Sequence, residues 1–281
     1  MIQDIQPKEF KNQFHIKEVH GEDYVLCYEK GAVLCLRDGE NMRLPTDDEL
    51  GVKDEDCTFI FSIDDSDFFL LRRKPDFIPE GFSYQPNTFL RTALPRYTAF
   101  AAFVGLHLCN WYNDTVFCGR CGEKLIPDDK ERMMRCDHCG NMIYPRISPG
   151  VIVAVTNGDK LLLTKYANRP GSTNYALIAG FTEIGEPLEK TVEREVMEEV
   201  GLKVKNITFY KSQPWAYSAS LLSGFFCELD GDDKITLEEN ELAMAGWFTA
   251  DEIDASADQM SLTREMIMLF KEGKHYIRRD K

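Results

Sequence analysis

The sequence predicts an α/β protein of the α+β kind, and three observations lead to that fold class. Short apolar runs separated by Asp, Gly and Pro fill the N-terminal block, which predicts strands. Four cysteines fall within 22 residues in the middle of the chain. The C-terminal block places strand-like runs around one amphipathic helix.

The composition limits the classes of partner that we expect. The chain has 281 residues, of which 43% are apolar, enough for two domains with their own cores. Its net charge of -14 argues against binding duplex DNA by excess Lys and Arg. No apolar run of about 18 residues occurs, and the stretch MIQDIQPKEFKNQF lacks an apolar signal core. We therefore expect a cytoplasmic protein without a membrane partner.

The N-terminal block, residues 1–115, is predicted to be a strand-rich α/β domain. The runs YVLCY, AVLCL, CTFIFSI and FFLLR predict strands and hairpins. Residues 92–113 predict a helix after Pro95, because Phe100, Val104 and Leu108 recur every fourth position. No constellation of catalytic residues occurs in this block, so we expect it to serve as a scaffold or dimerisation domain.

Residues 148–281 form the C-terminal block. Two apolar runs flank Asn157-Gly158-Asp159, which predicts a β-hairpin. Further strands are expected around ITFYKS and LLSGFFCEL. A helix is predicted from Pro187 to Val200 and ends at Gly201.

The middle segment, residues 116–147, carries two CxxC pairs separated by 14 residues: Cys118, Cys121, Cys136 and Cys139. Two such turns supply the four sulfurs that zinc favours, and a zinc ion held by four protein ligands is structural. An iron–sulfur site or four unrelated thiols are the alternatives. Nine cysteines, an odd number, argue against a disulfide framework. The segment is mildly basic, for which bracing between domains is favoured over gripping nucleic acid.

Three glutamates of the predicted helix lie at positions i, i+3 and i+4: Glu195, Glu198 and Glu199. They share an arc of about 100°, where like charges repel unless a cation binds, and their hard oxygens suit Mg²⁺ or Mn²⁺. Arg194 lies one turn before Glu198 and can pair with it. Gly180 and Gly185 are expected to allow the tight loop that brings Glu186 near. The alternative is an ordinary solvated acidic face.

The full spacing from Gly180 to Leu202 matches the pattern G-x5-E-x7-R-E-U-x-E-E-x-G-U, where U is bulky and apolar. Over residues 148–281 the sequence therefore resembles the Nudix hydrolases. The resemblance implies an α/β/α sandwich and metal-assisted attack of water on a diphosphate linked to a nucleoside.

The order of N-terminal domain, four-cysteine zinc ribbon, Nudix pattern and Ser212-Gln213-Pro214-Trp215 is similar to that of the NADH pyrophosphatase family. This resemblance implies a homodimer that hydrolyses NADH or NAD⁺ to nicotinamide mononucleotide and AMP. Some members of the family also remove NAD caps from RNA 5′ ends, which implies NAD-capped RNA as a further partner.

The same resemblance assigns roles by position. It implies that four glutamates hold the catalytic metal: Glu195, Glu198, Glu199 and Glu241. Glu199, or a water that it orients, would be the general base, with Glu198 and Arg194 in the catalytic set. Five residues would bind the substrate: Phe181, Trp215, Gln213, Ser220 and Tyr144. Phe181 and Trp215 would sandwich the nicotinamide, with Trp215 coming from the partner subunit.

One departure keeps the substrate open. The family motif runs SQPWPFPxS, whereas this chain has SQPWAYSAS, so that Ala216, Tyr217 and Ser218 replace Pro, Phe and Pro. A less rigid and more polar loop leaves NAD⁺, ADP-ribose and other dinucleotides as alternative substrates. A non-catalytic nucleotide sensor or RNA-binding protein is the alternative from another class.

Overall fold

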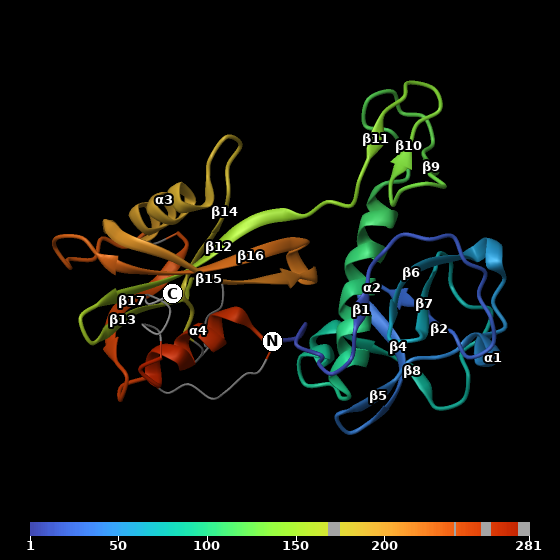
Figure 1. Ribbon diagram of the computed structural model, residues 1–281, viewed down its shortest axis with the longest axis horizontal. Helices are drawn as coiled ribbons and strands as arrows, with labels where there is room; N and C mark the ends of the chain where they lie inside the picture. The colour runs from blue at the N-terminus through green and yellow to red at the C-terminus, as the bar shows by residue number, and fades with distance from the viewer. Residues whose placement is uncertain (168–174, 239, 254–259, 275–281) are drawn as a thin grey trace. The chain divides into compact units, whose positions relative to one another are not determined.

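The computed structural model describes residues 1–167, 175–238, 240–253 and 260–274 (Figure 1). The chain divides into two compact units. One comprises residues Ile2–Arg146, and the other comprises Ile147–Lys281 together with Met1. Within the described ranges, no helix is both long enough and apolar enough to cross a membrane.

The N-terminal unit is rich in strands, as the apolar runs predict. One four-stranded sheet has the order β1-β6-β7-β2; a second has the order β3-β4-β5, with β8 also paired to β4. The run CTFIFSI forms β6 in its entirety. The strands are β1 (Phe10–Lys11), β2 (Tyr24–Leu26), β3 (Tyr28–Glu29), β4 (Ala32–Asp38), β5 (Asn41–Arg43), β6 (Cys57–Ile63), β7 (Ser66–Leu71) and β8 (Phe82–Pro86).

The longest helix among the described residues belongs to this unit and begins after Pro95, as predicted. It is α2 (Arg96–Asp114), and the apolar side chains of Phe100 and Leu108 are buried in it. The remaining helical turns are short: α1 (Asp47–Leu50), η1 (Asp54–Asp56) and η2 (Asn87–Arg91). After α2 the chain forms a three-stranded sheet of order β11-β10-β9. These strands are β9 (Ile126–Pro127), β10 (Met134–Arg135) and β11 (Met142–Ile143).

The C-terminal unit is built on a six-stranded mixed sheet. Its order is β15-β16-β12-β13-β17, with β14 paired to β12. Strands β12 and β16 are parallel, and the other pairs are antiparallel. The elements are β12 (Ser148–Asn157), β13 (Lys160–Tyr166), β14 (Ile178–Phe181), α3 (Leu188–Val200), β15 (Val204–Trp215), η3 (Ala216–Ser218), β16 (Ser220–Leu229), β17 (Leu242–Thr249) and α4 (Leu262–Lys271).

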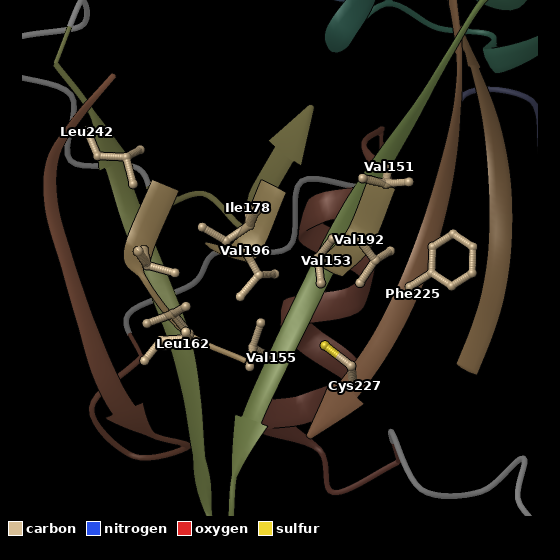
Figure 2. Close-up of a cluster of buried hydrophobic side chains, with 12 residues drawn as sticks. Val151, Val153, Val155, Leu162, Ile178, Val192, Val196, Phe225, Cys227 and Leu242 are labelled. Atoms are coloured by element: carbon tan, nitrogen blue, oxygen red, sulfur yellow. The ribbon is translucent and has the colours of Figure 1, made fainter. Parts of the chain in front are cut away.

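Alternate residues of β12 pack against different helices, which makes this unit a sandwich. Val151, Val153 and Val155 lie in one buried cluster with the α3 valines, part of which Figure 2 shows. The intervening Ile152 and Ala154 lie in a second cluster with α4. Because successive side chains of a strand point to opposite faces, the two helices cover opposite faces of the sheet. The predicted α/β/α sandwich is therefore confirmed.

Helix α3 begins and ends where the sequence predicts. Pro187 has the extended backbone of an N-cap. Gly201 closes the helix with a left-handed φ of 71°, and its amide donates a hydrogen bond to the Met197 carbonyl. The apolar repeat of the helix is fully buried at Val192, Val196 and Val200. Each buried valine stabilises the unit by roughly 1.5 kcal/mol or more, so α3 is fixed firmly enough to position the polar side chains on its other face.

Candidate active site and zinc centre

Arg194 is the hub of the polar face of α3. Its guanidinium makes a two-pronged contact with Glu186, with Nε 2.9 Å from Oε1 and Nη2 3.0 Å from Oε2. Nη1 donates to Glu195 Oε1 at 2.8 Å and to Glu198 Oε2 at 2.9 Å. Nη2 also donates to the Phe181 carbonyl at 2.8 Å. The predicted pairing with Glu198 is confirmed, and one cation holds three carboxylates and the end of β14.

Glu186 is held as a carboxylate by several donors. The Arg194 hydrogen bonds are the largest cause that lowers the pKa of Glu186, to about 2, and the Glu183 amide and the Thr191 hydroxyl contribute as well. Gly185 has a left-handed φ of 87°, as the predicted tight loop requires. Glu186 therefore closes the loop onto the helix as a fixed negative charge.

Glu199 has a contrasting environment. Only 2% of this residue is exposed, and its Oε2 has no hydrogen-bond partner among the residues that the structure describes. The pKa of Glu199 is raised to about 8, mainly by burial and also by the neighbouring charges of Glu195 and Glu241. A hydrogen bond from the Ala179 amide acts in the opposite direction. Burial is also the main cause that raises the pKa of Glu195.

These carboxylates fit a hard divalent cation. A buried carboxylate oxygen that accepts no hydrogen bond is costly. Glu199 has such an oxygen, and the charged groups that act on its carboxyl are the negative Glu195 and Glu241 rather than a basic residue. Oxygen ligands of this kind suit Mg²⁺ or Mn²⁺. The glutamate oxygens are not drawn together: within the described ranges, the four cysteines alone have three or more ligand atoms within 4.8 Å of one another. Instead, Arg194 donates to one oxygen of each carboxylate, Oε1 of Glu195 and Oε2 of Glu198.

Gly180 has a different role from the one expected. It lies within β14 and its φ is not left-handed, so freedom for a tight loop is not its contribution, and that expectation was wrong. A Cβ atom at this position would overlap the carboxylate of Glu195. A glycine is therefore required so that the strand can pass next to the Glu195 carboxylate.

We expect Gly180→Ala to displace the Glu195 carboxylate from Arg194. Overpacking of this kind costs about 1–3 kcal/mol, and kcat should fall by about 100-fold if Glu195 is the metal ligand that the family resemblance implies, because its carboxylate is misplaced. Urea denaturation and steady-state kinetics would measure the two effects. Adding Glu195→Asp, whose side chain is one methylene shorter, should restore stability but not turnover. An unchanged kcat in the single variant would contradict the steric role.

Phe181, Trp215 and Ser220 lie around the ends of β14, β15 and β16. The Phe181 ring is 53% exposed and is therefore open to stacking. Trp215 and Tyr217 meet edge to face, with ring centroids 5.3 Å apart. Ser220 is buried, and its hydroxyl lies 2.6 Å from that of Ser218. The departure from the family motif thus places Tyr217 directly against the Trp215 ring.

Gln213 lies in the interior. Its side chain is fully buried, Nε2 donates to the Met260 carbonyl at 2.7 Å, and Oε1 accepts from the Leu262 amide at 2.7 Å. Both ends of the amide thus tie β15 to the start of α4. This arrangement favours a structural role for Gln213 over the substrate-binding role that the family resemblance implies.

Tyr144 belongs to the N-terminal unit, where half of its surface is exposed. Its hydroxyl donates to Glu131 Oε2 at 2.5 Å, which links the end of the ribbon to the loop before β10. Its role in lining the substrate site stays a prediction.

The four cysteine sulfurs form a compact centre. Cys118 Sγ lies 3.6 Å from Cys139 Sγ, and Cys121 Sγ lies 3.5 Å from Cys136 Sγ. Zinc–sulfur bonds of about 2.3 Å in a tetrahedron place sulfurs about 3.8 Å apart, whereas a disulfide would require about 2 Å. The geometry therefore fits a zinc ion with four thiolate ligands and no open position, as predicted.

The two halves of the centre repeat one turn. Gly122 donates to the Cys118 carbonyl and Gly140 donates to the Cys136 carbonyl, and both glycines have left-handed φ angles. An amide hydrogen bond from Arg120 is the largest cause that lowers the pKa of Cys118, to about 6. This hydrogen bond favours the thiolate form of Cys118.

Two basic residues of the ribbon are engaged within the protein. The Arg132 guanidinium donates to the Ile60 carbonyl and to Asn12 Oδ1, which ties the ribbon to β6. Arg135 pairs with Asp128 and Asp137. These contacts favour the bracing role over a surface that grips nucleic acid.

The sequence pattern does not predict several groups that hydrogen-bond to the glutamates of the site. The Ala179 amide that bonds Glu199 and the Thr191 hydroxyl that bonds Glu186 carry no motif. The segment before β17 is tied to the end of α3, since the amides of Thr236 and Glu238 donate to the Val200 and Glu199 carbonyls. The only sequence signal for these contacts is the position of each residue next to a recognised glutamate.

Comparisons with known proteins agree with this architecture. Residues 146–270 match the family model of the NUDIX domain, and residues 113–144 match that of the NADH pyrophosphatase zinc ribbon domain. Proteins named NAD-capped RNA hydrolase NudC from Citrobacter koseri and Shigella flexneri are each 38% identical over 163 residues. Those alignments cover 58% of this chain and 63% of each relative, so the chain spans less than two thirds of their length.

Solved structures give a further likeness. A Nudix hydrolase from Nitrosomonas europaea is 23% identical, with a TM-score of 0.49 over 57% of this chain and 92% of that one. The zinc ribbon match and the four clustered sulfurs together identify the cysteine centre as a structural zinc site. Residues 146–270 are therefore similar to NUDIX domains, and they follow a segment similar to the NADH pyrophosphatase zinc ribbon domain.

Proposed function

We propose that this protein hydrolyses the diphosphate bond of NADH or NAD⁺ to give nicotinamide mononucleotide, reduced or oxidised, and AMP. The same reaction on NAD-capped RNA would remove the cap. The observation that carries the proposal is the buried Glu199 carboxylate, whose unpartnered oxygen lies in the fields of Glu195 and Glu241. The name of the relatives that share the zinc ribbon and the NUDIX domain supports the choice of substrate.

Each residue of the site has a task in this reaction. Hydrolysis adds water across the P–O–P bridge: its oxygen bonds one phosphorus, the bridging P–O bond breaks, and the bridging oxygen leaves on the other phosphate. The glutamates would hold Mg²⁺ or Mn²⁺, which would offset the charge of the diphosphate and lower the pKa of a bound water. We assign Glu199 Oε2 as the atom that accepts the proton of the water.

Two further groups would set the geometry. Arg194 holds Glu195 and Glu198 in fixed positions, so a metal can bind without ordering them first. The exposed Phe181 ring is the surface on which we place the nicotinamide, since flat rings gain from stacking.

A substrate panel tests the proposal. NADH, NAD⁺, ADP-ribose and NAD-capped RNA would be incubated with Mg²⁺ or Mn²⁺, and the products would be resolved by mass. We expect nicotinamide mononucleotide and AMP from the dinucleotides, with kcat/KM highest for NADH, NAD⁺ or the capped RNA. A higher kcat/KM for ADP-ribose than for the other three compounds would change the proposed substrate but not the proposed hydrolysis of a diphosphate bond. Binding of all four without turnover would identify a nucleotide sensor.

We further propose that the protein acts as a homodimer through residues 1–115 and that Trp215 completes the site of the partner subunit. We expect Glu199→Gln and Trp215→Ala chains to complement each other when they are co-expressed. Half of the molecules would then pair different chains, and each such pair would hold one intact site, so about a quarter of the sites would be active. No recovery above the separate variants would place Trp215 in its own subunit's site.

A further inference from the structure

A groove lies along the outer surface of α3, beside the glutamate face. Its volume is about 570 Å³, and its lining includes Lys190, Arg194 and Met197 of the helix and Lys203 and Val204 at the start of β15. At 100° per residue, Arg194 lies about 40° from Glu198 around the helix, and Glu198 lies about 60° from Glu195. Going around the helix from Glu195 past Glu198, one therefore reaches the groove next. A substrate that extends beyond the metal-binding face would enter it there.

Each acidic side chain of the groove lining has a basic partner. Glu193 pairs with Lys190 at 2.6 Å, Asp230 pairs with Lys205 at 3.0 Å, and Glu186 pairs with Arg194. Lys203 is exposed, and no carboxylate of the described residues lies within 4.0 Å of its ammonium group. The C-terminal block has a net charge of -7, so a groove with an unneutralised lysine is a place where a phosphate is attracted rather than repelled.

The groove also offers an apolar surface. Met197 is 42% exposed, and Leu202 and Val204 line the groove beside it. A methionine thioether adapts to flat rings and contacts aromatic systems favourably. A surface for a ring next to a free cation matches a nucleotide, which carries a base and a phosphodiester.

We infer that this groove binds the first nucleotides of single-stranded RNA that follow the diphosphate of an NAD cap, with a phosphodiester at Lys203 and a base on Met197. The inference rests on the proposed function. NADH ends at its adenosine, whereas a capped RNA continues from that adenosine as a phosphodiester chain. Lys203 and Met197 would therefore set the preference for capped RNA and leave hydrolysis of the free dinucleotide unaffected.

Reversal of the charge at Lys203 tests this. For the Lys203→Glu variant, kcat/KM for NAD-capped RNA should fall about tenfold or more, and that for NADH should change less than twofold. The salt dependence of the RNA reaction should weaken by a slope of about 0.7, the value for one lost phosphate contact on a single strand. Any gain in kcat/KM between a capped mononucleotide and a capped tetranucleotide should disappear. Lys203→Arg should restore all three properties.

Lys160→Glu provides the matched control, because Lys160 is also exposed but lies on the β12–β13 hairpin. It should change neither substrate's kinetics nor the salt slope. Equal losses of Lys203→Glu on NADH and on RNA would overturn the inference, since the residue would then act through the active site. An unchanged RNA reaction would overturn it as well. Failure of the wild-type protein to hydrolyse NADH, measured in the same assay, would instead overturn the proposed function on which the inference rests.

Discussion

Replacing Glu199 by glutamine is expected to stabilise the metal-free protein while it removes most of its activity. Burial and the charges of Glu195 and Glu241 raise the pKa of Glu199 from 4.5 to about 8, so the fold favours the neutral acid. A group with a raised pKa in the folded state contributes stability fully below its unfolded pKa. That contribution is lost as the pH rises from about 4.5 to about 8. At pH 8 the ionised Glu199 therefore destabilises the metal-free fold.

Glutamine is neutral at every pH and has nearly the same shape. The free energy of unfolding in chelator should rise by roughly 4 kcal/mol at pH 8, and the difference from wild type should vanish near pH 4. Because we propose that the carboxylate binds the metal and accepts the proton of the water, kcat should fall by at least about 100-fold. Urea denaturation across pH 4–8 in EDTA and turnover in excess Mg²⁺ would measure the two effects.

Two other glutamates of α3 serve as controls. Glu198→Gln should lower kcat without stabilising the metal-free protein, because the Glu198 side chain is 59% exposed and is paired with Arg194. Glu193→Gln, on the outer surface of the same helix, should leave NADH turnover unchanged. Near-wild-type turnover of Glu199→Gln would exclude Glu199 from the mechanism. If Glu199→Gln were less stable than wild type at pH 8, the Glu199 carboxylate would not destabilise the metal-free fold.

The parts of the site that the sequence predicts well are local ones. Helix α3 is bounded by Pro187 and Gly201 as expected, and the pairing of Arg194 with Glu198 follows from their spacing of one turn. The repeated CxxC turns likewise bring the sulfurs together within two short loops. In each case the information lies within a few residues, and the regular geometry of a helix or a turn converts spacing into proximity.

The parts that the sequence does not predict depend on distant segments. The family resemblance places Gln213 next to the substrate, yet its amide is satisfied by the backbone at Met260 and Leu262, almost fifty residues later. The residue type of Gly180 suggests a tight loop. In the structure a glycine is needed there because a Cβ atom would overlap the Glu195 carboxylate of the neighbouring helix. Residue type shows that space or a hydrogen bond is needed, but only the tertiary fold shows which group supplies it.

Loss of one zinc ligand is expected to unfold the ribbon. Cys136 is 2% exposed, and its sulfur lies 3.5 Å from that of Cys121. In Cys136→Ser a hydroxyl replaces a thiolate, so the zinc content should fall from one ion per chain to well below one. Structural zinc contributes on the order of 10 kcal/mol to the folding of small metal-binding modules. The strands β9, β10 and β11 are each two residues long and form two pairings, so they offer little to replace it.

His138 supplies the matched control, because it lies between Cys136 and Cys139 but is surplus once four thiolates bind zinc. His138→Ala should keep one zinc ion per chain and resist proteolysis between residues 118 and 143. Cys136→Ser should be cut there readily. Elemental analysis and limited proteolysis followed by mass spectrometry would measure both properties. Full zinc content in Cys136→Ser would exclude Cys136 as a ligand.

Thermal unfolding of Cys136→Ser, followed by calorimetry, and its residual turnover distinguish a structural zinc from a catalytic one. Unfolding of the ribbon releases the Arg132 contacts with Ile60 and Asn12, so the transition of the N-terminal unit should move to lower temperature. The C-terminal unit has its own sheet and two clusters of its own, so its transition should shift little. Because four thiolates leave zinc no position for water, chemistry at the glutamate face does not require the ion. Residual NADH turnover of Cys136→Ser in Mg²⁺ should therefore persist at temperatures below that transition, whereas a catalytic zinc would make the loss complete.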